Sequence, residues 1–492
     1  MHDLVFRSAS LMDGSGAPAR VAHVVVDQGL ITTILDADDA TPTPAAHQTV
    51  DCAGLVLAPG FIDVHTHDDA LMLEKALLHK AHPKLSQGVT TVVIGNCGIS
   101  LAPLQSDGVR ELPAPLNILK SEVFRFSSVS DYFEALDTQP PVCNVVTLIG
   151  HTSLRVKHMS DTAKPATSAE VTAMAAEVEA AMQQGAWGLS TGVFYPPARA
   201  ATMDEMISVA QPLAPFGGLL TMHIRDDTSQ IDSALEEAFA VGRSVKVPLV
   251  ISHHKLSGKP NHGRSVQTLA LIEKASQQQD VCLDCYPYDA SSTMLMPERV
   301  HLSREVLITW SSAEPAAAGR SLFQMAEERG LTPKAMAEQL LPAGAVNFSM
   351  DEADVQRIMQ HPLTMIGSDG LPGDPHPHPR LWGSFPRVLG RYARKQGLFP
   401  LENAVRKMTS WPASRFGLDK ATPQRAARGL VKEGWAADLV LFDAQSVQDN
   451  ASYDQPEKPS TGVMEVYLSG HLAAKDGLTV NAHAGRALRR AG

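Results

Sequence analysis

Short apolar runs typical of buried strands alternate with longer helical stretches between about residues 57 and 418, and this alternation limits the possible folds more than any other feature. Strands covered on both faces are apolar on both faces, and their alternation with helices builds a parallel sheet. Eight such runs occur, at residues 61–64, 90–94, 144–149, 188–190, 219–223, 248–252, 281–285 and 364–367. They predict an α/β fold in which the sheet closes into a (β/α)8 barrel of the TIM type.

Three segments depart from this alternation. Residues 291–346 are too long for an ordinary strand–helix connection, and we expect them to form an insertion on top of the barrel. Residues 1–56 and 421–492 contain strands and turns, and neither segment can bury a sheet face alone. We therefore expect the two chain ends to pair in one small discontinuous domain, similar to a β-sandwich, beside a barrel of residues 57–420.

The composition narrows the possible partners. Acidic residues outnumber basic residues by 53 to 42, and the net charge of −11 argues against binding to nucleic acid or to an anionic membrane. No apolar run reaches the roughly 18 residues of a membrane span, and the N-terminus does not resemble a signal peptide. A cytoplasmic location is therefore expected, while the sequence leaves the oligomeric state open.

Two histidines follow the first strand-like run with one residue between them. Side chains in a strand alternate between faces, so His65 and His67 point the same way and Thr66 points away. Two imidazoles at this spacing suit a divalent transition metal, most often zinc. The alternative is a pair of partly exposed histidines at a strand end, so the choice depends on ligands elsewhere in the chain.

Further metal-binding side chains end or follow other strand-like runs. Cys97 follows the second run, His223 ends the fifth, His253 follows the sixth and Asp369 follows the eighth. In barrel enzymes the active site forms at the C-terminal ends of the strands. Imidazole, thiolate and carboxylate groups suit zinc, and a bridging thiolate would let the set hold one or two ions. The sequence therefore predicts a zinc site at the top of the barrel.

Several of these segments resemble a known family. Residues 59–67, Pro-Gly-Phe-Ile-Asp-Val-His-Thr-His, resemble the first-strand signature of the amidohydrolase superfamily. Four further segments resemble the N-acyl-D-amino-acid deacylases (D-aminoacylases), at residues 95–98, 221–225, 251–255 and 367–370. The resemblance covers nearly the whole chain. Cys97 is the discriminating feature, because related hydantoinases and dihydroorotases usually use a carboxylated lysine as the bridging ligand.

The resemblance assigns six side chains to two metal positions, His65, His67 and Asp369 to one and Cys97, His223 and His253 to the other. The second position is the tight zinc site of the family, so one tightly bound zinc ion is expected, with room for another. Zinc lowers the pKa of bound water to about 7. Asp369 would act as the general base and later protonate the leaving amine. The expected substrate is a small N-acyl-D-amino acid, cleaved to a carboxylate and a free D-amino acid.

Five side chains are expected to bind the substrate: Lys255, Tyr195, Tyr286, Ser292 and Arg299. Lys255 matches the family's lysine and is placed to pair with the substrate α-carboxylate. Tyr195 follows the fourth strand and is expected to hydrogen-bond the carbonyl or the carboxylate, while Tyr286 and Ser292 have equally plausible core or loop roles. Arg299 lies in the insertion and would pair with an acidic substrate side chain. This motivates the hypothesis that N-acyl-D-glutamate is preferred.

Two other functions remain open at this point. A cyclic-amide hydrolase, similar to a hydantoinase or dihydroorotase, would share the fold, but Cys97 argues against it. A non-catalytic scaffold of the same fold would be expected to lose ligands, whereas every ligand position is filled here.

Overall fold

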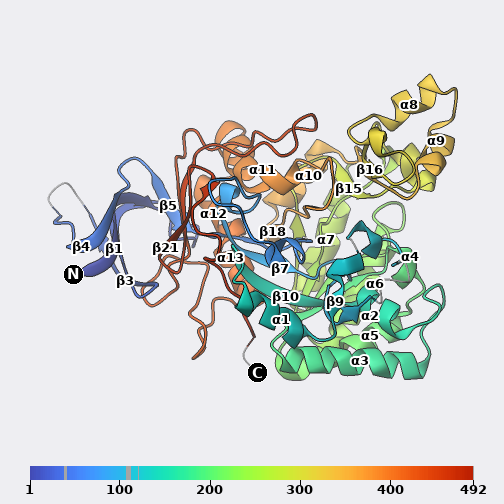
Figure 1. Ribbon diagram of the computed structural model, residues 1–492, viewed down its shortest axis with the longest axis horizontal. Coiled ribbons are helices and arrows are strands. Elements are labelled where there is room, and N and C mark those ends of the chain that lie inside the picture. Colours follow the sequence, from blue (N-terminus) through green and yellow to red (C-terminus); the bar gives the residue numbers. More distant parts are fainter. Residues whose placement is uncertain (38–40, 107–111, 120, 491–492) are drawn as a thin grey trace.

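Eight parallel strands form the centre of the computed structural model, which describes residues 1–37, 41–106, 112–119 and 121–490 (Figure 1). All eight predicted strands are present, as β6 (Phe61–Asp63), β7 (Val89–Ile94), β10 (Asn144–Gly150), β11 (Gly188–Gly192), β12 (Leu219–His223), β13 (Leu249–Ile251), β14 (Val281–Cys285) and β18 (Thr364–Ile366). Their order in the sheet is β18-β14-β13-β12-β11-β10-β7-β6. The sheet forms a nearly closed barrel, which confirms the predicted fold class.

Helices connect these strands and cover the outside of the barrel (Figure 1). They are α1 (Val129–Thr138), α2 (His151–His158), α3 (Ser168–Gln183), α4 (Pro196–Arg199), α5 (Met203–Ala210), α6 (Ile231–Val245), α7 (Ser265–Ser276), α10 (Glu352–Gln360), α11 (Arg380–Arg387), α12 (Leu401–Met408) and α13 (Ser410–Phe416). In α6, Leu235, Ala238, Phe239 and Gly242 are buried at helical spacing. One face of this helix therefore packs on the barrel.

The first and last barrel strands meet at a seam. Within the described residues, β6 and β18 are the two ends of the strand order, and the segments that continue from them form one isolated bridge, between Thr66 and Gly370. Beside it, the N–H of Asp369 donates a hydrogen bond of 2.8 Å to the carbonyl of His65. The seam therefore joins the segments that carry the first and last predicted metal ligands.

The insertion has a small sheet of its own, at the upper right of Figure 1. Strands β15 (Ser291–Met294), β17 (Ala343–Asn347) and β16 (Val306–Ser311) pair antiparallel in that order. Helices α8 (Leu322–Glu328) and α9 (Pro333–Leu340) close an apolar core over it. Strand β15 follows closely after β14, so the insertion leaves the barrel near the predicted site.

Strands from both chain ends form one nine-stranded mixed sheet, at the left of Figure 1. They are β1 (His2–Leu11), β2 (Arg20–Asp27), β3 (Leu30–Asp36), β4 (Ala46–Asp51), β5 (Val56–Pro59), β19 (Leu439–Phe442), β20 (Val463–Leu468), β21 (His471–Lys475) and β22 (Leu478–Thr479). The sheet curls, so that Phe6 packs edge-on against Tyr467 with ring centroids 4.9 Å apart. Because the two ends share one apolar core, we propose residues 1–56 and 421–492 as one discontinuous domain.

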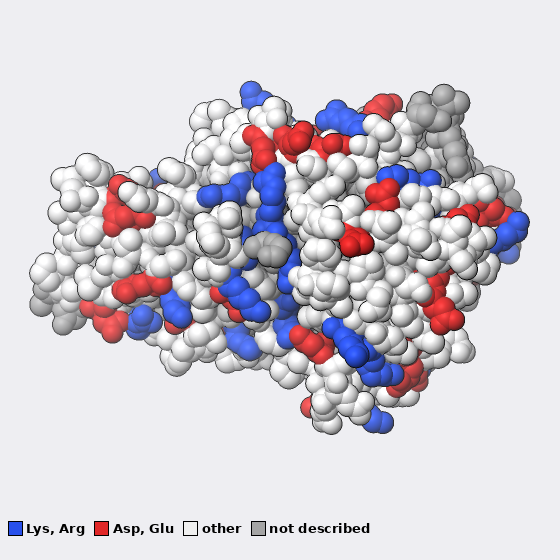
Figure 2. Space-filling view, turned by 90° about the horizontal axis from the view of Figure 1, so that it is seen from below, with Lys and Arg blue, Asp and Glu red and all other residues white. Residues whose placement is uncertain are grey.

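Charged side chains of both signs are mixed on the face shown in Figure 2, where basic side chains gather in a band across the middle. Among the helices of the described residues, none combines the length and the apolar character that crossing a membrane requires.

Candidate metal centre

All six predicted metal ligands lie where barrel strands end. His65 and His67 follow β6, Cys97 follows β7, His223 ends β12, His253 follows β13 and Asp369 follows β18. The C-terminal ends of parallel barrel strands share one rim, which is why residues distant in sequence meet there. Five of the six are buried, and His67 is partly exposed.

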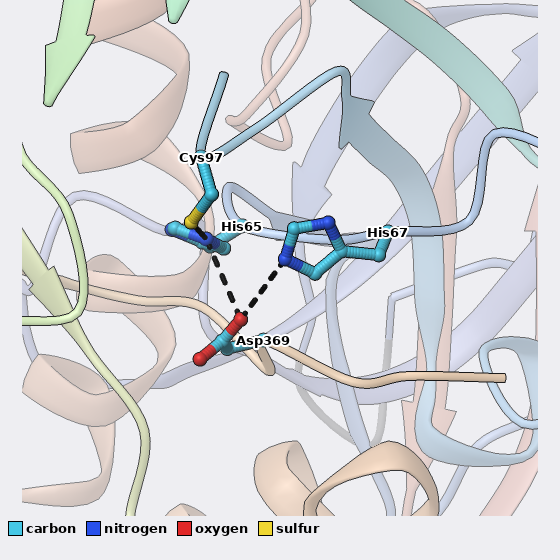
Figure 3. A group of neighbouring side chains, drawn as sticks. All are labelled: His65, His67, Cys97 and Asp369. Carbon is cyan, nitrogen blue, oxygen red and sulfur yellow. Dashed lines mark hydrogen bonds and ion pairs between the residues drawn. The ribbon is translucent and has the colours of Figure 1, made fainter. Parts of the chain in front are cut away.

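The first group of ligand atoms combines two imidazoles, a thiol and a carboxylate (Figure 3). Oδ1 of Asp369 lies 3.2 Å from Nε2 of His67 and 3.5 Å from Nε2 of His65. Sγ of Cys97 lies 3.2 Å from the same His65 nitrogen. One ligand atom from each of these four residues lies within 4.8 Å of the others.

The second group consists of Cys97, His223 and His253. Sγ of Cys97 lies 3.3 Å from Nε2 of His253, which lies 3.0 Å from Nδ1 of His223. Cys97 belongs to both groups, so its sulfur is placed to bridge two ions.

The chemistry of these donors fits zinc, which binds imidazole nitrogen, thiolate sulfur and carboxylate oxygen. The backbone also turns sharply at three of the ligands, where φ is +54° at Cys97, +35° at His253 and +51° at Asp369. Such conformations cost non-glycine residues about 1–3 kcal/mol and persist where the surrounding structure holds them. Three of the six candidate ligands adopt such a conformation, which indicates that the surrounding structure holds the backbone strained in order to place their side chains.

Burial and neighbouring groups favour the metal-binding forms of three ligands, whereas Cys97 and Asp369 raise the pKa of His65 and His67 despite burial, so these two imidazoles lose a proton on binding a metal. Burial opposes ionisation of Cys97, but His65 and the other imidazoles hold the pKa of its thiol well below the usual value. Burial, together with the charge of Lys255, lowers the pKa of His253 to about 3, so its imidazole is neutral near pH 7. Burial also opposes ionisation of Asp369, yet Arg380 and His65 hold its pKa well below the usual value. A thiolate, a neutral imidazole and a carboxylate are the forms that metals bind.

Asp284 in β14 supports both groups, although sequence patterns did not single it out. Its carboxylate lies 3.3 Å from Nδ1 of His65 and accepts a hydrogen bond of 2.9 Å from the backbone N–H of His253. Carboxylates commonly orient ligating histidines in this way. The available signal was a lone charged residue in the otherwise uncharged strand at residues 281–285.

Arg380 also contributes to the site without having been predicted. Its Nη1 lies 2.9 Å from Oδ2 of Asp369, and its guanidinium lies over the ring of Tyr286, 4.5 Å from the centroid. Arg380 is buried at the start of α11, beyond a loop whose path the sequence pattern does not reveal. Because Arg380 holds Oδ2 of Asp369, Oδ1 is the oxygen that faces the imidazoles.

A cavity of about 570 Å³, open mouth included, lies beside the ligands. Its lining includes all five predicted substrate-binding residues, Lys255, Tyr195, Tyr286, Ser292 and Arg299, together with His223, His253 and Asp369. Among the described residues, the buried Oγ of Ser292 has no hydrogen-bond partner. This hydroxyl is available to a ligand in the cavity.

Two cations in this cavity share one buried carboxylate. Nη2 of Arg299 pairs with Asp227 at 2.5 Å, and Nζ of Lys255 lies 4.0 Å from the same carboxylate. Nζ of Lys255 also lies 2.9 Å from Nδ1 of His253. The pairs with Arg299 and Lys255 lower the pKa of Asp227 to about 2, against the effect of burial. The three charges sum to one positive charge.

A second cavity, of about 500 Å³ with its mouth, lies on the other side of Tyr195 and Thr293. These two side chains are hydrogen-bonded at 3.0 Å between their hydroxyl oxygens. The cavity also reaches Asp369, and its other lining is mainly apolar, with Ile99, Pro115, Leu119, Leu371 and Pro372. The ligand cluster therefore opens onto one charged and one apolar cavity.

Comparison with known proteins places the chain in a family. Residues 48–295 and 314–474 match the amidohydrolase family. Three proteins of Alcaligenes xylosoxydans xylosoxydans are similar over most of their length. A D-aminoacylase is 49% identical (99% of this chain and 98% of the relative), an N-acyl-D-aspartate deacylase 48% (95% and 91%) and an N-acyl-D-glutamate deacylase 43% (95% and 93%).

Solved structures agree with the sequence comparison. A D-aminoacylase described with a binuclear metal centre has a TM-score of 0.93 and 48% identity, with both chains fully covered. The N-acyl-D-glutamate deacylase of Bordetella bronchiseptica, in complex with zinc and a phosphonate mimic of the tetrahedral intermediate, has a TM-score of 0.91 and 42% identity over 99% of each chain. The chain therefore belongs to the D-aminoacylase family of metal-dependent amidohydrolases.

Proposed function

We propose that this protein is a zinc-dependent deacylase that cleaves the amide bond of N-acyl-D-amino acids. The observation that carries the proposal is the pair of ligand groups sharing Cys97, placed next to a cavity that holds Lys255 and Arg299. The relatives described above support the D configuration and the linear amide.

The ligand groups would hold the metal, and other residues would position the reactants. When bound, zinc supplies Lewis acidity that activates water and polarises the amide carbonyl. Oδ1 of Asp369 is placed to accept the proton of the attacking water and to pass it to the leaving nitrogen. Arg380 holds the second oxygen of Asp369 and so keeps the carboxylate oriented.

The two cavities suggest how the substrate lies. Its α-carboxylate would occupy the charged cavity, where Lys255 supplies a cation and Ser292 an unpaired hydroxyl. Tyr195 and Tyr286 would line the path of the amino acid in the same cavity. The acyl group would extend into the apolar cavity beside Leu371, because both cavities meet at Asp369.

We further propose N-acyl-D-glutamate as a preferred substrate, as Arg299 in the cavity can bind a second carboxylate. Asp227 already pairs with this arginine, so an acidic substrate side chain must compete with it. The net charge of Lys255, Arg299 and Asp227 is +1, which balances one substrate carboxylate, whereas N-acyl-D-glutamate carries two. The preference for an acidic side chain should therefore be modest, and it should depend on Asp227.

Metal removal combined with a choice of substrates tests the proposal. Purified protein is assayed with N-acetyl-D-amino acids, hydantoin and dihydroorotate, before and after chelation and after zinc is restored. We expect bound zinc, cleavage of the linear amides, loss of activity on chelation and recovery with zinc. Faster cleavage of the cyclic amides would indicate a hydantoinase-like enzyme. A protein without zinc, and without activity after zinc addition, would indicate a non-catalytic scaffold.

A further inference from the structure

Lys84 is a completely buried lysine beside the seam between β6 and β18. Its Nζ donates hydrogen bonds of 2.9 Å to Oδ2 of Asp63 and to Oγ of Ser368, and it lies 3.2 Å from Oδ2 of Asp68. All four side chains have an exposed fraction of 0%. Burying ions costs several kcal/mol each, so a cluster of this kind is weak evidence of added stability. Its position in the fold is more informative.

The cluster joins two segments that carry metal ligands. Asp63 ends β6, two residues before His65, and Ser368 immediately precedes Asp369. Oδ1 of Asp63 accepts a hydrogen bond of 2.8 Å from the N–H of Ser368 and lies 3.4 Å from the N–H of His65. One carboxylate therefore binds backbone on both sides of the seam, and Lys84 holds its other oxygen.

The two segments are also in close contact near these bonds. A Cβ atom at Gly367 would lie 2.6 Å from Cβ of His65, which explains why this position needs glycine. The isolated bridge between Thr66 and Gly370 follows directly. Elsewhere in the barrel, backbone hydrogen bonds join neighbouring strands. Along this seam, side-chain hydrogen bonds from the buried cluster help to join β6 and β18.

We propose that Lys84 is a positioning residue for the metal group that contains His65, His67 and Asp369. Through Asp63 and Ser368 it fixes the two sides of the seam and so sets the distance between Asp369 and His67. The second group should depend on it much less, because Cys97, His223 and His253 follow strands β7, β12 and β13, each paired in ladders on both sides. The inference rests on the proposed function only in taking these residues as zinc ligands.

The test measures the affinity of the protein for each of its zinc ions, by competition with a chelator. Lys84→Met removes the cation, Lys84→Arg retains it, and Ser368→Ala removes one hydrogen bond without leaving a charge unpaired. Glu205→Gln is the control, because Glu205 is the centre of another buried ion cluster, with His151 and Arg155. Because Cys97 belongs to both groups, two reference variants assign the bound ions: His223→Ala weakens the ion of the Cys97, His223 and His253 group, and His67→Ala weakens the ion of the other group.

In Lys84→Met and Ser368→Ala we expect the zinc ion of the His65, His67 and Asp369 group to bind about 10–100-fold more weakly. Losses of this size are typical when residues that support metal ligands are replaced. The ion that His223→Ala weakens should keep its affinity in these Lys84 and Ser368 variants, and Lys84→Arg should restore part of the loss. Glu205→Gln should lower the melting temperature with both affinities unchanged. If Lys84 had only a structural role, its variants would also show a lower melting temperature with unchanged zinc affinities. That result would overturn the inference.

If the wild type binds only one zinc equivalent, crystal structures decide. A larger separation of Asp369 and His67 in Ser368→Ala and Lys84→Met supports the inference, and an unchanged separation contradicts it. The proposed function is tested separately by wild-type activity. A wild type that cleaves no N-acyl-amino acid but shows the selective zinc effect would refute the proposed function and leave the role of Lys84 intact.

Discussion

Nε2 of His67 lies 3.2 Å from Oδ1 of Asp369, across the seam between the first and last strands of the barrel. The two residues come from opposite ends of the strand order, so their distance is set by how the barrel closes. This contact joins a candidate metal ligand to the candidate general base, and it links the fold directly to the proposed chemistry.

Replacement of Asp369 should separate catalysis from zinc binding. Asp369→Asn removes the proposed base, and general acid–base groups contribute roughly 10²–10⁴-fold to rates. We expect kcat to fall within this range while the zinc held by Cys97, His223 and His253 remains, as measured by metal content of the purified variant. Near wild-type kcat in a zinc-loaded Asp369→Asn protein would show that the base is elsewhere.

The pairing of Arg299 with Asp227 predicts opposite effects of two substitutions on substrate choice. Arg299→Ala should lower the ratio of kcat/KM for N-acetyl-D-glutamate over N-acetyl-D-leucine, because it removes the cation that meets the acidic side chain. Asp227→Asn should raise this ratio, because it releases Arg299 from its partner. Each change should be several-fold. An unchanged ratio in Arg299→Ala contradicts the proposed preference for an acidic side chain.

The apolar cavity predicts a dependence on acyl-chain length. Each buried methylene group contributes about 0.8 kcal/mol, so a chain that fits the cavity should gain binding free energy as it lengthens. Leu371→Trp would fill part of the cavity and should lower the ratio of kcat/KM for N-hexanoyl over N-acetyl substrates by about tenfold, the loss of roughly two buried methylene groups. Val266→Trp, on the exposed face of α7, is the control. Equal ratios in the two variants would exclude this cavity as the acyl site.

Glu205, a buried carboxylate distant from the metal ligands, predicts that the stability of the folded protein falls at acidic pH. Burial opposes ionisation of Glu205, but its hydrogen bonds with His151 and Arg155 lower its pKa to about 2, below the ordinary value of 4.5. A lowered folded-state pKa stabilises the protein above pH 4.5, and this contribution is lost as the pH falls toward 2. The shift corresponds to about 3 kcal/mol.

This dependence is measured as the melting temperature of chelated wild type and Glu205→Gln at several pH values, since chelation removes the effect of zinc release. The wild type should be more stable near pH 7, and the difference should shrink between about pH 4.5 and pH 3. A difference that stays constant over this range would contradict the assignment.

The sequence predicted the barrel, and it predicted that the candidate ligands meet at the barrel rim, for a simple physical reason. Buried strands have a recognisable apolar pattern, and the ends of parallel strands share one rim, so His65 and His253 could be expected to meet without a structure. The supporting residues depend on packing between distant segments. Arg380 reaches Asp369 from a helix beyond an unpredictable loop, and Lys84 crosses a seam that exists only after the barrel closes. Asp284 was accessible in principle, as a lone carboxylate in an otherwise uncharged strand.

The most direct test of the central claim is the release of free amine from a panel of N-acetyl-D- and N-acetyl-L-amino acids by the zinc-loaded wild type, with acidic side chains included. We predict that the D-enantiomers are hydrolysed in preference to their L-counterparts. Absence of amine release from every D-substrate, or faster hydrolysis of the L-enantiomers, would contradict the assignment as an N-acyl-D-amino-acid deacylase.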